Sequence, residues 1–295
     1  MELFFLLKIN NIKMNITKRI AIQGYPGAFH EIAIRCYYPR EVVEIVPTDT
    51  FDELIEVVEN GTHADGGLMA IENTIAGSLL NNYQLLNNSN LRITGEIFLR
   101  IRQNLMALPG QKIEDLREVH SHPVAIEQCR PFFKKHQHIK LIAMEDTALS
   151  AKRIRDGELI GIGAIASTLA ANQYRMNLLA EGIETNKKNF TRFLVVDKES
   201  PKVLSTEINK ISICFSAPHK AGSLHNALKV LAVHQANMTK IQSVPLIGKA
   251  WRYIFFIDFI LENYEDLSKI IDQLKSHTAG LKILGEYKEG VLYDS

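Results

Sequence analysis

Cysteine is scarce in this sequence. Three cysteines occur among 295 residues, Cys36, Cys129 and Cys214, and no two of them have Cys-x-x-Cys spacing. An odd number of widely separated cysteines excludes a disulfide framework. We therefore expect free, buried thiols and a reducing, cytoplasmic compartment.

An excess of charge of one sign is also lacking. The 34 Lys and Arg residues face 33 Asp and Glu residues, so the formal net charge is +1, and no basic block stands out. This balance argues against a polyanionic partner such as nucleic acid.

A long apolar run is lacking near the N-terminus. The apolar stretch at residues 3–7 is too short to span a membrane or to act as an export signal. We expect residues 1–17 to form a disordered leader, and Met1 and Met14 both stay open as start sites.

What the sequence does have is a regular alternation of apolar strands and helical patterns. Its 46% hydrophobic content suffices for two or three compact units. Extended segments at 19–23, 42–46 and 67–71 alternate with helical patterns at 28–37, at 50–59 and from about 77. This order predicts an α/β unit with a mostly parallel sheet, from which residues 91–108 cross into a second α/β lobe.

The second lobe repeats the pattern, and its strand-to-helix loops end in Ser or Thr. Ser121, Thr147 and Ser167 stand where helix N-caps are expected. Helix N-termini gathered at the carboxyl ends of parallel strands favour anions, because unpaired N–H groups and the helix dipole point into the cleft. The sequence therefore predicts a small anionic ligand between the two lobes.

Residues 198–207 are polar and aperiodic, as expected of a linker, and a compact pattern follows. Expected strands at 210–215, 239–247, 251–260 and 281–287 alternate with helices that begin near 221 and 267. The order βαββαβ predicts a ferredoxin-like α+β fold.

One stretch, Asn189-Phe-Thr191-Arg192-Phe193, places a polar pair between aromatic residues. In an extended segment Thr191 and Arg192 point to opposite faces. A solvated edge strand would explain the pair without any function. Taken with several other motifs, however, the stretch resembles the prephenate dehydratase family over residues 18–287. The other motifs are Gly24-Tyr-Pro-Gly27, Ile71-Glu72-Asn73-Thr74, Gly77-Ser78, Ser121-His122-Pro123, Gln128-Cys129 and Glu145 with Thr147.

The resemblance implies a monofunctional enzyme that converts prephenate to phenylpyruvate in L-phenylalanine biosynthesis, with no metal or organic cofactor. It implies a two-lobed catalytic domain like the type II periplasmic binding proteins over residues 18–197. Lobe 1 would cover about 18–97 and 182–197, and lobe 2 about 98–181. A linker (198–207), an ACT regulatory domain (208–287) and a tail (288–295) would follow.

The resemblance also assigns site residues. Thr191 would be the proton donor, and because a threonine hydroxyl is a weak acid we expect it to need a polarised network with Ser121, Gln128 and Glu145. The implied catalytic residues are Thr191, Glu72, Asn73, Ser121, Gln128 and Glu145, and the implied substrate-binding residues are Gly77, Ser78, Thr147, Ser167, Arg192 and Phe193. Simpler explanations stay open: a plain turn at Glu72 and Asn73, plain N-caps at Ser121 and Thr147, and a structural ion pair at Arg192.

A regulatory site is implied as well. The loop Ala221-Gly222-Ser223-Leu224 resembles the ACT-domain helix start, and with Gln242 and Ser243 it would bind L-phenylalanine as an inhibitor at contacts in a homodimer or homotetramer. Where phenylalanine-responsive relatives usually carry Glu-Ser-Arg-Pro, this chain has Gln242-Ser243-Val244-Pro245. We expect weakened, not abolished, binding.

Four alternatives stay open beside this reading. The substrate could be arogenate, or the fold could serve a non-catalytic sensor of small anions or amino acids. Gly161-Ile-Gly163-Ala-Ile-Ala166 matches a dinucleotide motif, but its glycines fall inside an expected strand. His120-x-His122 suggests a metal, but no further ligand stands at suitable spacing.

Overall fold

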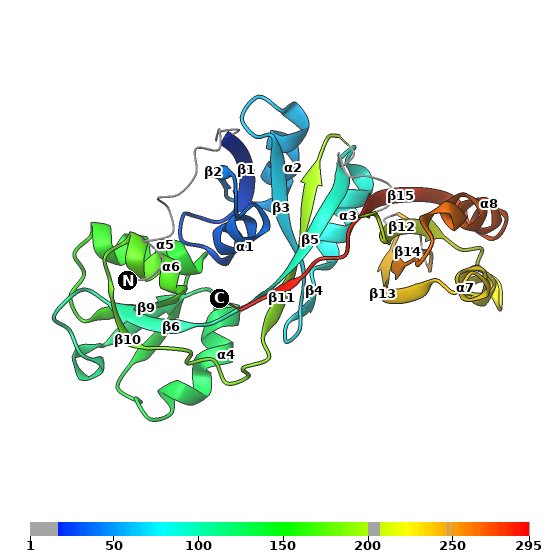
Figure 1. The fold of residues 1–295 in the computed structure, drawn as a ribbon. Coiled ribbons are helices and arrows are strands. Elements are labelled where there is room, and N and C mark those ends of the chain that lie inside the picture. The colour runs from blue at the N-terminus through cyan, green and yellow to red at the C-terminus, as the bar shows by residue number, and fades with distance from the viewer. Residues whose placement is uncertain (1–16, 200–206, 247, 250, 295) are drawn as a thin grey trace.

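Alternating strands and helices build the N-terminal lobe, as the sequence predicts (Figure 1). The computed structural model describes residues 17–199, 207–246, 248–249 and 251–294, so the expected leader before Thr17 and most of the expected linker lie outside the described residues. Lobe A consists of β1 (Thr17–Gln23), α1 (Phe29–Tyr37), β2 (Val42–Thr48), α2 (Phe51–Asn60), β3 (Gly66–Asn73), β4 (Gly77–Ser78), α3 (Leu80–Asn88), β5 (Arg92–Arg100) and β11 (Phe190–Asp197).

The sheet of lobe A is parallel at one end and antiparallel at the other. Strand β1 pairs in parallel with β2 and β3, whereas β11 returns late in the chain and pairs antiparallel with β3 and β5. Helix α2 shows why a helix forms here: the Thr50 side chain accepts the N–H of Glu53, and Gly61 ends the helix in the left-handed region at φ 68°.

Lobe B is a second, smaller α/β unit. Its sheet has the order β10-β6-β9-β7-β8, in which β7, β9 and β8 are parallel. The elements are β6 (Asn104–Ala107), the 3₁₀ turn Ile113–Asp115, β7 (Glu118–Ser121), α4 (Pro123–Phe133), β8 (Lys140–Ala143), α5 (Thr147–Asp156), β9 (Ile162–Ala166), α6 (Thr168–Gln173) and β10 (Asn177–Ala180).

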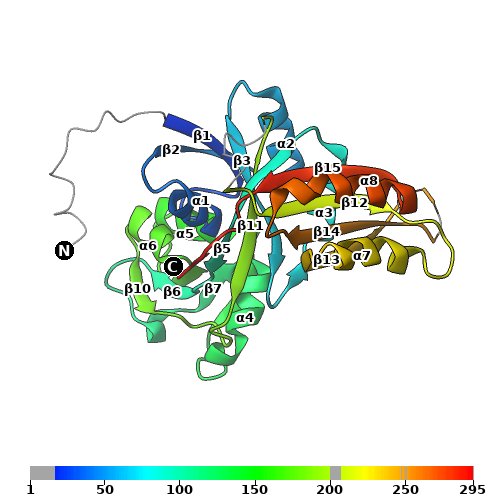
Figure 2. The ribbon, with the colours of Figure 1, turned by 45° about the vertical axis from the view of Figure 1, so that its right-hand side comes forward.

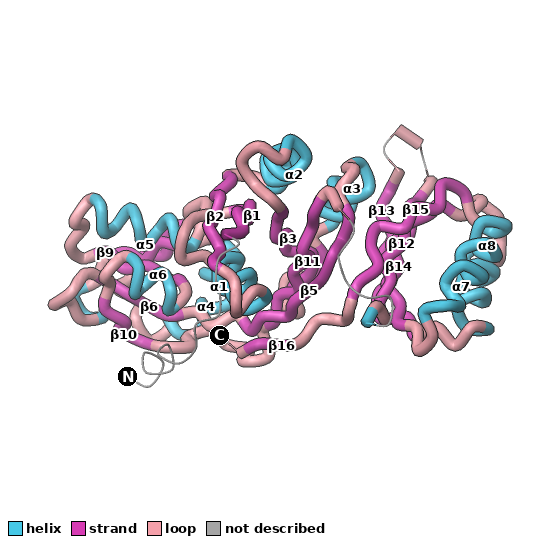
Figure 3. The backbone as a smooth tube through the Cα atoms, turned by 45° about the horizontal axis from the view of Figure 1, so that its top comes forward, coloured by secondary structure: helices cyan, strands magenta, loops and turns pink. Residues whose placement is uncertain are grey.

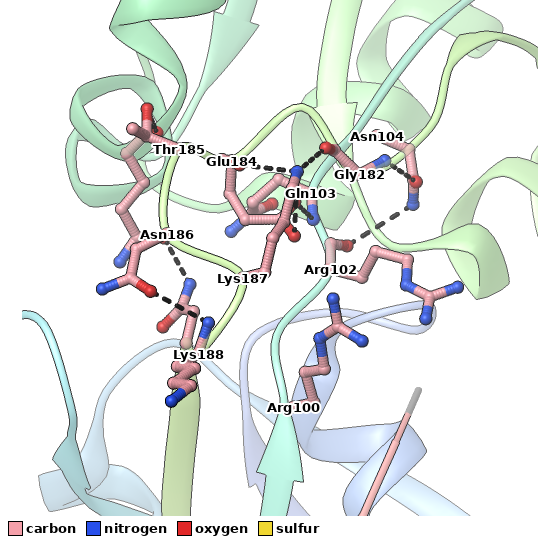
Figure 4. A network of polar contacts seen from close by, with 12 residues as sticks. Arg100, Arg102, Gln103, Asn104, Gly182, Glu184, Thr185, Asn186, Lys187 and Lys188 are labelled. Carbon is pink, nitrogen blue, oxygen red and sulfur yellow. Dashed lines mark hydrogen bonds and ion pairs between the residues drawn. The ribbon is translucent and has the colours of Figure 1, made fainter.

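Two chain segments join the lobes, one after β5 and one before β11. Figure 4 shows them side by side: the Glu184 carboxylate accepts the backbone N–H of Gln103 at 2.9 Å, and the Asn104 Oδ1 accepts the N–H of Gly182 at 3.0 Å. These bonds tie the two crossings into one connection between the lobes.

The C-terminal unit has the predicted βαββαβ order. It consists of β12 (Lys210–Ser216), α7 (Ser223–Val233), β13 (Asn237–Pro245), β14 (Tyr253–Ile260), the 3₁₀ turn Tyr264–Asp266, α8 (Leu267–His277) and β15 (Ala279–Tyr287). Helices α7 and α8 pack together on one face of its strands, as Figure 3 shows. The other face shares a core with α2 and α3 of lobe A, to which Leu54, Tyr83 and Phe256 belong.

The C-terminal unit is not a separate sheet. Strand β15 pairs with β5 at Gly285 and Ile93. The four strands of the C-terminal unit therefore continue the sheet of lobe A, in the order β13-β14-β12-β15-β5-β11-β3-β1-β2. A side chain at position 285 would meet the carbonyl of Ile93, so glycine is required for this close approach. Sequence patterns did not predict this junction.

The expected tail is also structured. Strand β16 (Leu292–Tyr293) pairs with β5, and the tail runs back along β5 to the junction of the lobes in both Figure 1 and Figure 2. There the Asp294 carboxylate bonds to Arg100 and Arg102 at 3.1 to 3.2 Å.

The three cysteines are unpaired; Cys129 and Cys214 are buried, whereas Cys36 is half-buried. Across the described ranges, no helix is both long and apolar enough to cross a membrane.

Candidate active site

A pocket of about 270 Å³ lies between the two lobes. Both lobes and the connection between them contribute to its walls. Its lining residues are Gln23, Ala28, Phe29, His30, Ala70, Asn73, Ala76, Leu79, Ile101, Gln103, His122, Val124, Ala125, Gln128, Glu145, Asp146, Thr147, Thr191 and Phe193.

Helix N-termini meet at this pocket, as expected from the sequence. Helices α1, α4 and α5 all begin with residues that line it. Their N–H groups and dipoles favour a negatively charged ligand. Among the described lining residues none is Lys or Arg, and Glu145 and Asp146 are acidic, so the partial positive charge at the pocket comes from the helix N-termini.

Thr191 and Asn73 face each other on the floor of the pocket. They are cross-strand partners on β11 and β3, and both are nearly buried. The Asn73 Oδ1 accepts the N–H groups of Ile75 and Ala76, each at 2.9 Å, which fixes the orientation of the amide. The Asn73 Nδ2 therefore donates to the Thr191 Oγ1 at 3.0 Å. Because the hydroxyl oxygen accepts this bond, its own proton is free to be donated into the pocket.

The same amide orients two further side chains. The Asn73 Nδ2 also donates to the Asn189 Oδ1 at 2.8 Å, and the Asn189 Nδ2 in turn donates to the Gln128 Oε1 at 2.8 Å. The Gln128 amide is thereby held with its Oε1 occupied and its Nε2 available as a donor. A continuous chain of hydrogen bonds through Asn73 and Asn189 thus connects the Thr191 hydroxyl to Gln128 of lobe B.

Thr147, Glu145 and Phe193 also line the pocket, in agreement with where the sequence placed them. Phe193 is buried, while Glu145 is largely exposed and pairs with Arg153 at 2.7 Å. The pairing with Arg153 holds the pKa of Glu145 below its usual range. Glu145 is therefore ionised near neutral pH and is not a proton donor to Thr191.

Arg192 lies outside the pocket, which corrects its expected role in substrate binding. It points to the opposite face of β11, as the alternation of a strand requires. Its guanidinium pairs with Glu96 at 2.6 Å and with Asp258 at 2.5 Å, and it donates to the Tyr287 hydroxyl at 3.2 Å. Arg192 therefore forms a structural ion pair, the alternative that the sequence analysis left open.

Glu72 and Ser78 also face away from the pocket. Lys240 of the C-terminal unit bonds to the Glu72 carboxylate at 2.7 Å and to the Ser78 hydroxyl at 2.8 Å. Gly77 lies beside them at φ 84°, a conformation that suits glycine and turns the chain from β3 into β4. These three residues shape the turn next to Asn73 and are not part of the pocket lining.

Ser121 and Ser167 serve structural hydrogen bonds. The buried Ser121 hydroxyl donates to the carbonyl of Ile165 at 2.7 Å inside lobe B. The Ser167 hydroxyl caps α6 and donates to the carbonyl of Gly27 at 2.6 Å, which joins lobe B to the first loop of lobe A. Neither hydroxyl reaches the pocket, so the expected contact of Ser121 with Thr191 is absent.

Two expected N-caps are shifted by one residue. Asp146, not Thr147, caps α5 by accepting the N–H of Leu149 at 2.7 Å. His122, not Ser121, caps α4, because its Nδ1 accepts the N–H of Val124 at 3.3 Å. The nearby His120 pairs with Glu118 instead of pointing toward His122.

Burial shifts the pKa of several groups at the pocket. Burial raises the pKa of the Asp146 carboxyl, and it lowers the pKa of His122, which Asp146 partly opposes. Burial lowers the pKa of His30 to about 4. The two imidazoles are therefore neutral near pH 7 and add hydrogen-bonding capacity without charge.

Several residues of the pocket were missed by sequence reasoning. Asn189 was quoted in the motif but given no role, although its spacing of two from Thr191 places both on one face. Gln103 and His30 carried no signal, since neither belongs to a motif of recognisable spacing. Asp146 was missed because the N-cap of α5 was expected at Thr147.

The expected effector loop borders a second pocket, of about 370 Å³, in the C-terminal unit. Ala221, Ser223 and Leu224 line it together with Trp251, and Gly222 adopts φ 80° at the start of α7. Gln242 and Ser243 lie on β13 and do not line this pocket. Val244, which stands where the resemblance leads us to expect arginine, is buried in the core shared with lobe A.

The fold and this pocket define a two-lobed α/β protein with a pocket between its lobes and a ferredoxin-like unit that continues the sheet of lobe A. The family model described as prephenate dehydratase matches residues 20–201. The chain belongs to the prephenate dehydratase family.

Curated relatives agree with this membership. Arogenate dehydratase/prephenate dehydratase 2, chloroplastic, of Arabidopsis thaliana is 37% identical, and the match covers 91% of this chain and 72% of the relative. A bifunctional chorismate mutase/prephenate dehydratase of Aquifex aeolicus is 36% identical over 84% of this chain and 67% of the relative.

Solved structures share the fold over nearly the whole chain. One, described as a novel type of quorum quenching acylase, has a TM-score of 0.82 at 30% identity and covers 92% of this chain and 98% of its own. Another, prephenate dehydratase from Arthrobacter aurescens in complex with L-Phe, has a TM-score of 0.80 at 24% identity and covers 92% and 89%.

Proposed function

We propose that this chain converts prephenate to phenylpyruvate, carbon dioxide and water in L-phenylalanine biosynthesis. The observation that carries the proposal is the Thr191 hydroxyl, held by Asn73 on the floor of the inter-lobe pocket with its proton free to be donated. We further propose that residues 18–197 form the catalytic domain.

The reaction requires that the ring hydroxyl be protonated as it leaves. The bond between the ring and its carboxylate breaks, its electron pair forms the last double bond of the aromatic ring, and the hydroxyl leaves from the opposite carbon. Hydroxide is a poor leaving group, so a donor must protonate it as it departs. Thr191 supplies this proton, the N–H donated by Asn73 stabilises the oxygen that remains, and a proton from solvent restores the hydroxyl before the next turnover.

The carboxylates of the substrate are held by the helix N-termini. Helix α1, which has no side-chain cap, presents N–H groups to the pocket, the dipoles of α4 and α5 add partial positive charge, and Gln128 and Gln103 add neutral amides. Together they fix the substrate in a reactive orientation, which accounts for part of the rate enhancement.

The test is direct. Purified protein is mixed with prephenate and, separately, with arogenate, without added nucleotide or metal, and phenylpyruvate and phenylalanine are followed by absorbance and chromatography. Product from prephenate is expected. Failure to convert either compound would refute an enzymatic role and favour a sensor on the same fold.

Arogenate is a second candidate, because the pocket contains carboxylates. Asp146 and Glu145 both line it, and a carboxylate would pair with the ammonium group that arogenate carries in place of the keto oxygen. The plant relative at 37% identity also carries both substrate names. The ratio of kcat/KM for the two compounds in the same preparation decides between them.

We propose that the C-terminal unit, residues 208–287, is an ACT regulatory domain that binds L-phenylalanine as an inhibitor. Its pocket beside Gly222 supports this role, as does the complex of a similar fold with L-Phe. The buried Val244 cannot make the ionic contact of an arginine, so we keep the expectation of weakened affinity.

This regulatory role is tested on the full chain, since Asp258 and Tyr287 of the unit cover Arg192 of the catalytic domain and a truncated chain would expose it. Ala221→Glu places a negative charge in the second pocket. It should abolish both the change of Trp251 fluorescence on adding phenylalanine and the inhibition. Undiminished inhibition would place the effector elsewhere.

We also propose a homodimer or homotetramer that acts in the cytoplasm. Strand β13 is the outer edge of the long sheet, and its Met238 and Ile241 are 39% and 40% exposed, which suits pairing with a second copy. Sedimentation of wild-type protein and of Ile241→Lys would test the contact.

A further inference from the structure

Two neighbouring cross-strand pairs on β3 and β11 face opposite sides of the sheet. Thr191 and Asn73 face the inter-lobe pocket, while Arg192 and Glu72, the next pair along, face the C-terminal unit. Each residue of the proposed catalytic pair therefore has a charged chain neighbour that forms an ion pair with the C-terminal unit: Glu72 with Lys240, and Arg192 with Asp258.

Glu72 forms its ion pair with one lysine of the C-terminal unit. Lys240 reaches from β13 to the Glu72 carboxylate at 2.7 Å and to the Ser78 hydroxyl at 2.8 Å. The lysine side chain is 14% exposed and that of Glu72 34% exposed, so water competes only partly for the ion pair.

Glu72 and Ser78 are themselves the paired residues at the base of a tight hairpin. Strands β3 and β4 pair Glu72 with Ser78 and Asn73 with Gly77. The turn between them supplies the N–H groups of Ile75 and Ala76 that orient the Asn73 amide. The Lys240 ammonium therefore bonds to both strands of the hairpin, at the residue pair next to Asn73.

We propose that Lys240 is a positioning residue for catalysis: from the C-terminal unit it clamps the β3–β4 hairpin and so holds Asn73 where its amide donates to Thr191. This inference rests on the proposed function. The pocket is then complete only when the C-terminal unit is in place, and a shift of β13 reaches Asn73 through two side chains.

A merely structural role predicts something different. A partly exposed ion pair contributes modestly to stability, so losing it would lower the unfolding temperature slightly and leave turnover as it was. A positioning role predicts lower kcat with little change in KM, because the substrate still meets the same helix N-termini while the proton donor is misplaced.

The experiment compares Lys240→Met with Lys269→Met in the full chain. Methionine keeps the apolar stem and removes the ammonium, and Lys269 forms an exposed pair with Asp266 at 2.9 Å far from the hairpin. We expect kcat to fall about tenfold in Lys240→Met at nearly constant KM, and to stay within about twofold in Lys269→Met.

A charge swap and an activity-independent readout complete the design. The double variant Glu72→Lys with Lys240→Glu restores the pair and should recover most of the lost kcat. Hydrogen exchange at the amides of Ile75 and Ala76 should accelerate in Lys240→Met and return in the double variant.

Unchanged exchange and unchanged kcat in Lys240→Met would overturn the proposal, as would a swap that restores neither. An inactive wild type would overturn the proposed function, while the exchange data would still decide whether Lys240 holds the hairpin.

Discussion

The central prediction concerns the Thr191 hydroxyl. Thr191→Val keeps the shape of the side chain and removes the one proton that the hydrogen-bond chain leaves free for the substrate. We expect turnover to fall by about 10²- to 10⁴-fold, the usual contribution of a positioned general acid, which corresponds to about 3–5 kcal/mol of barrier. KM should change little, because the helix N-termini that hold the carboxylates are untouched.

The same change should affect folding only slightly. The variant loses the bond between Asn73 and Thr191, worth about 1 kcal/mol, and Asn73 keeps its bond to Asn189. Chemical denaturation followed by circular dichroism measures this loss.

A matched control is available on the adjacent strand. Thr94 lies on β5, is half-buried and donates to the carbonyl of Val195 at 3.4 Å, away from the pocket. Thr94→Val should cost similar stability and leave turnover unchanged. If Thr191→Val kept more than about a tenth of wild-type turnover, the proton would have to come from another group.

Three further predictions concern stability. Burial lowers the pKa of His30 from its ordinary value of 6.5 to about 4, so the unfolded chain binds more protons than the folded chain between these pH values. The free energy of unfolding should therefore fall by up to about 3 kcal/mol as the pH drops from 6.5 to 4. His30→Leu should remove this acid dependence in denaturation curves. Arg192→Leu leaves the Glu96 and Asp258 carboxylates buried without their partner and should cost about 3–5 kcal/mol of unfolding free energy, measured by urea denaturation. Asp294→Asn breaks an exposed pair with two arginines and should cost less than about 1 kcal/mol, whereas deleting residues 290–294 removes β16 and should lower the Tm by several degrees.

The fold was largely predictable because its signals are local. Alternating strands and helices, glycine turns and the βαββαβ order all follow from patterns within about 20 residues. The junction of β15 with β5 and the return of β16 could not be predicted, since they depend on contacts between segments about 190 residues apart in the chain. Only the glycine at 285 hinted at a close approach, and a lone glycine in a strand has several explanations.

The site was predictable in part for the same reason. The period of two placed Thr191 and Arg192 on opposite faces, and the structure has them so. Sequence alone could not say that Asp258, 66 residues later, covers Arg192, or that Lys240 covers Glu72. The motifs therefore led to a catalytic role for Glu72 and a substrate-binding role for Arg192, although the partners of both residues lie in the C-terminal unit.

No lysine or arginine is among the described lining residues of the pocket, and this fits the proposed reaction better than a cationic lining would. The ring carboxylate loses its charge as carbon dioxide leaves, so a lysine or arginine beside it would stabilise the starting state more than the transition state and slow the reaction. Helix N-termini and the amides of Gln128 and Gln103 attract the dianion with partial charges, and Phe193 and Ile101 supply apolar surface. The strong cation of the motif, Arg192, is instead placed behind the strand, where it joins the C-terminal unit to the catalytic sheet without opposing decarboxylation.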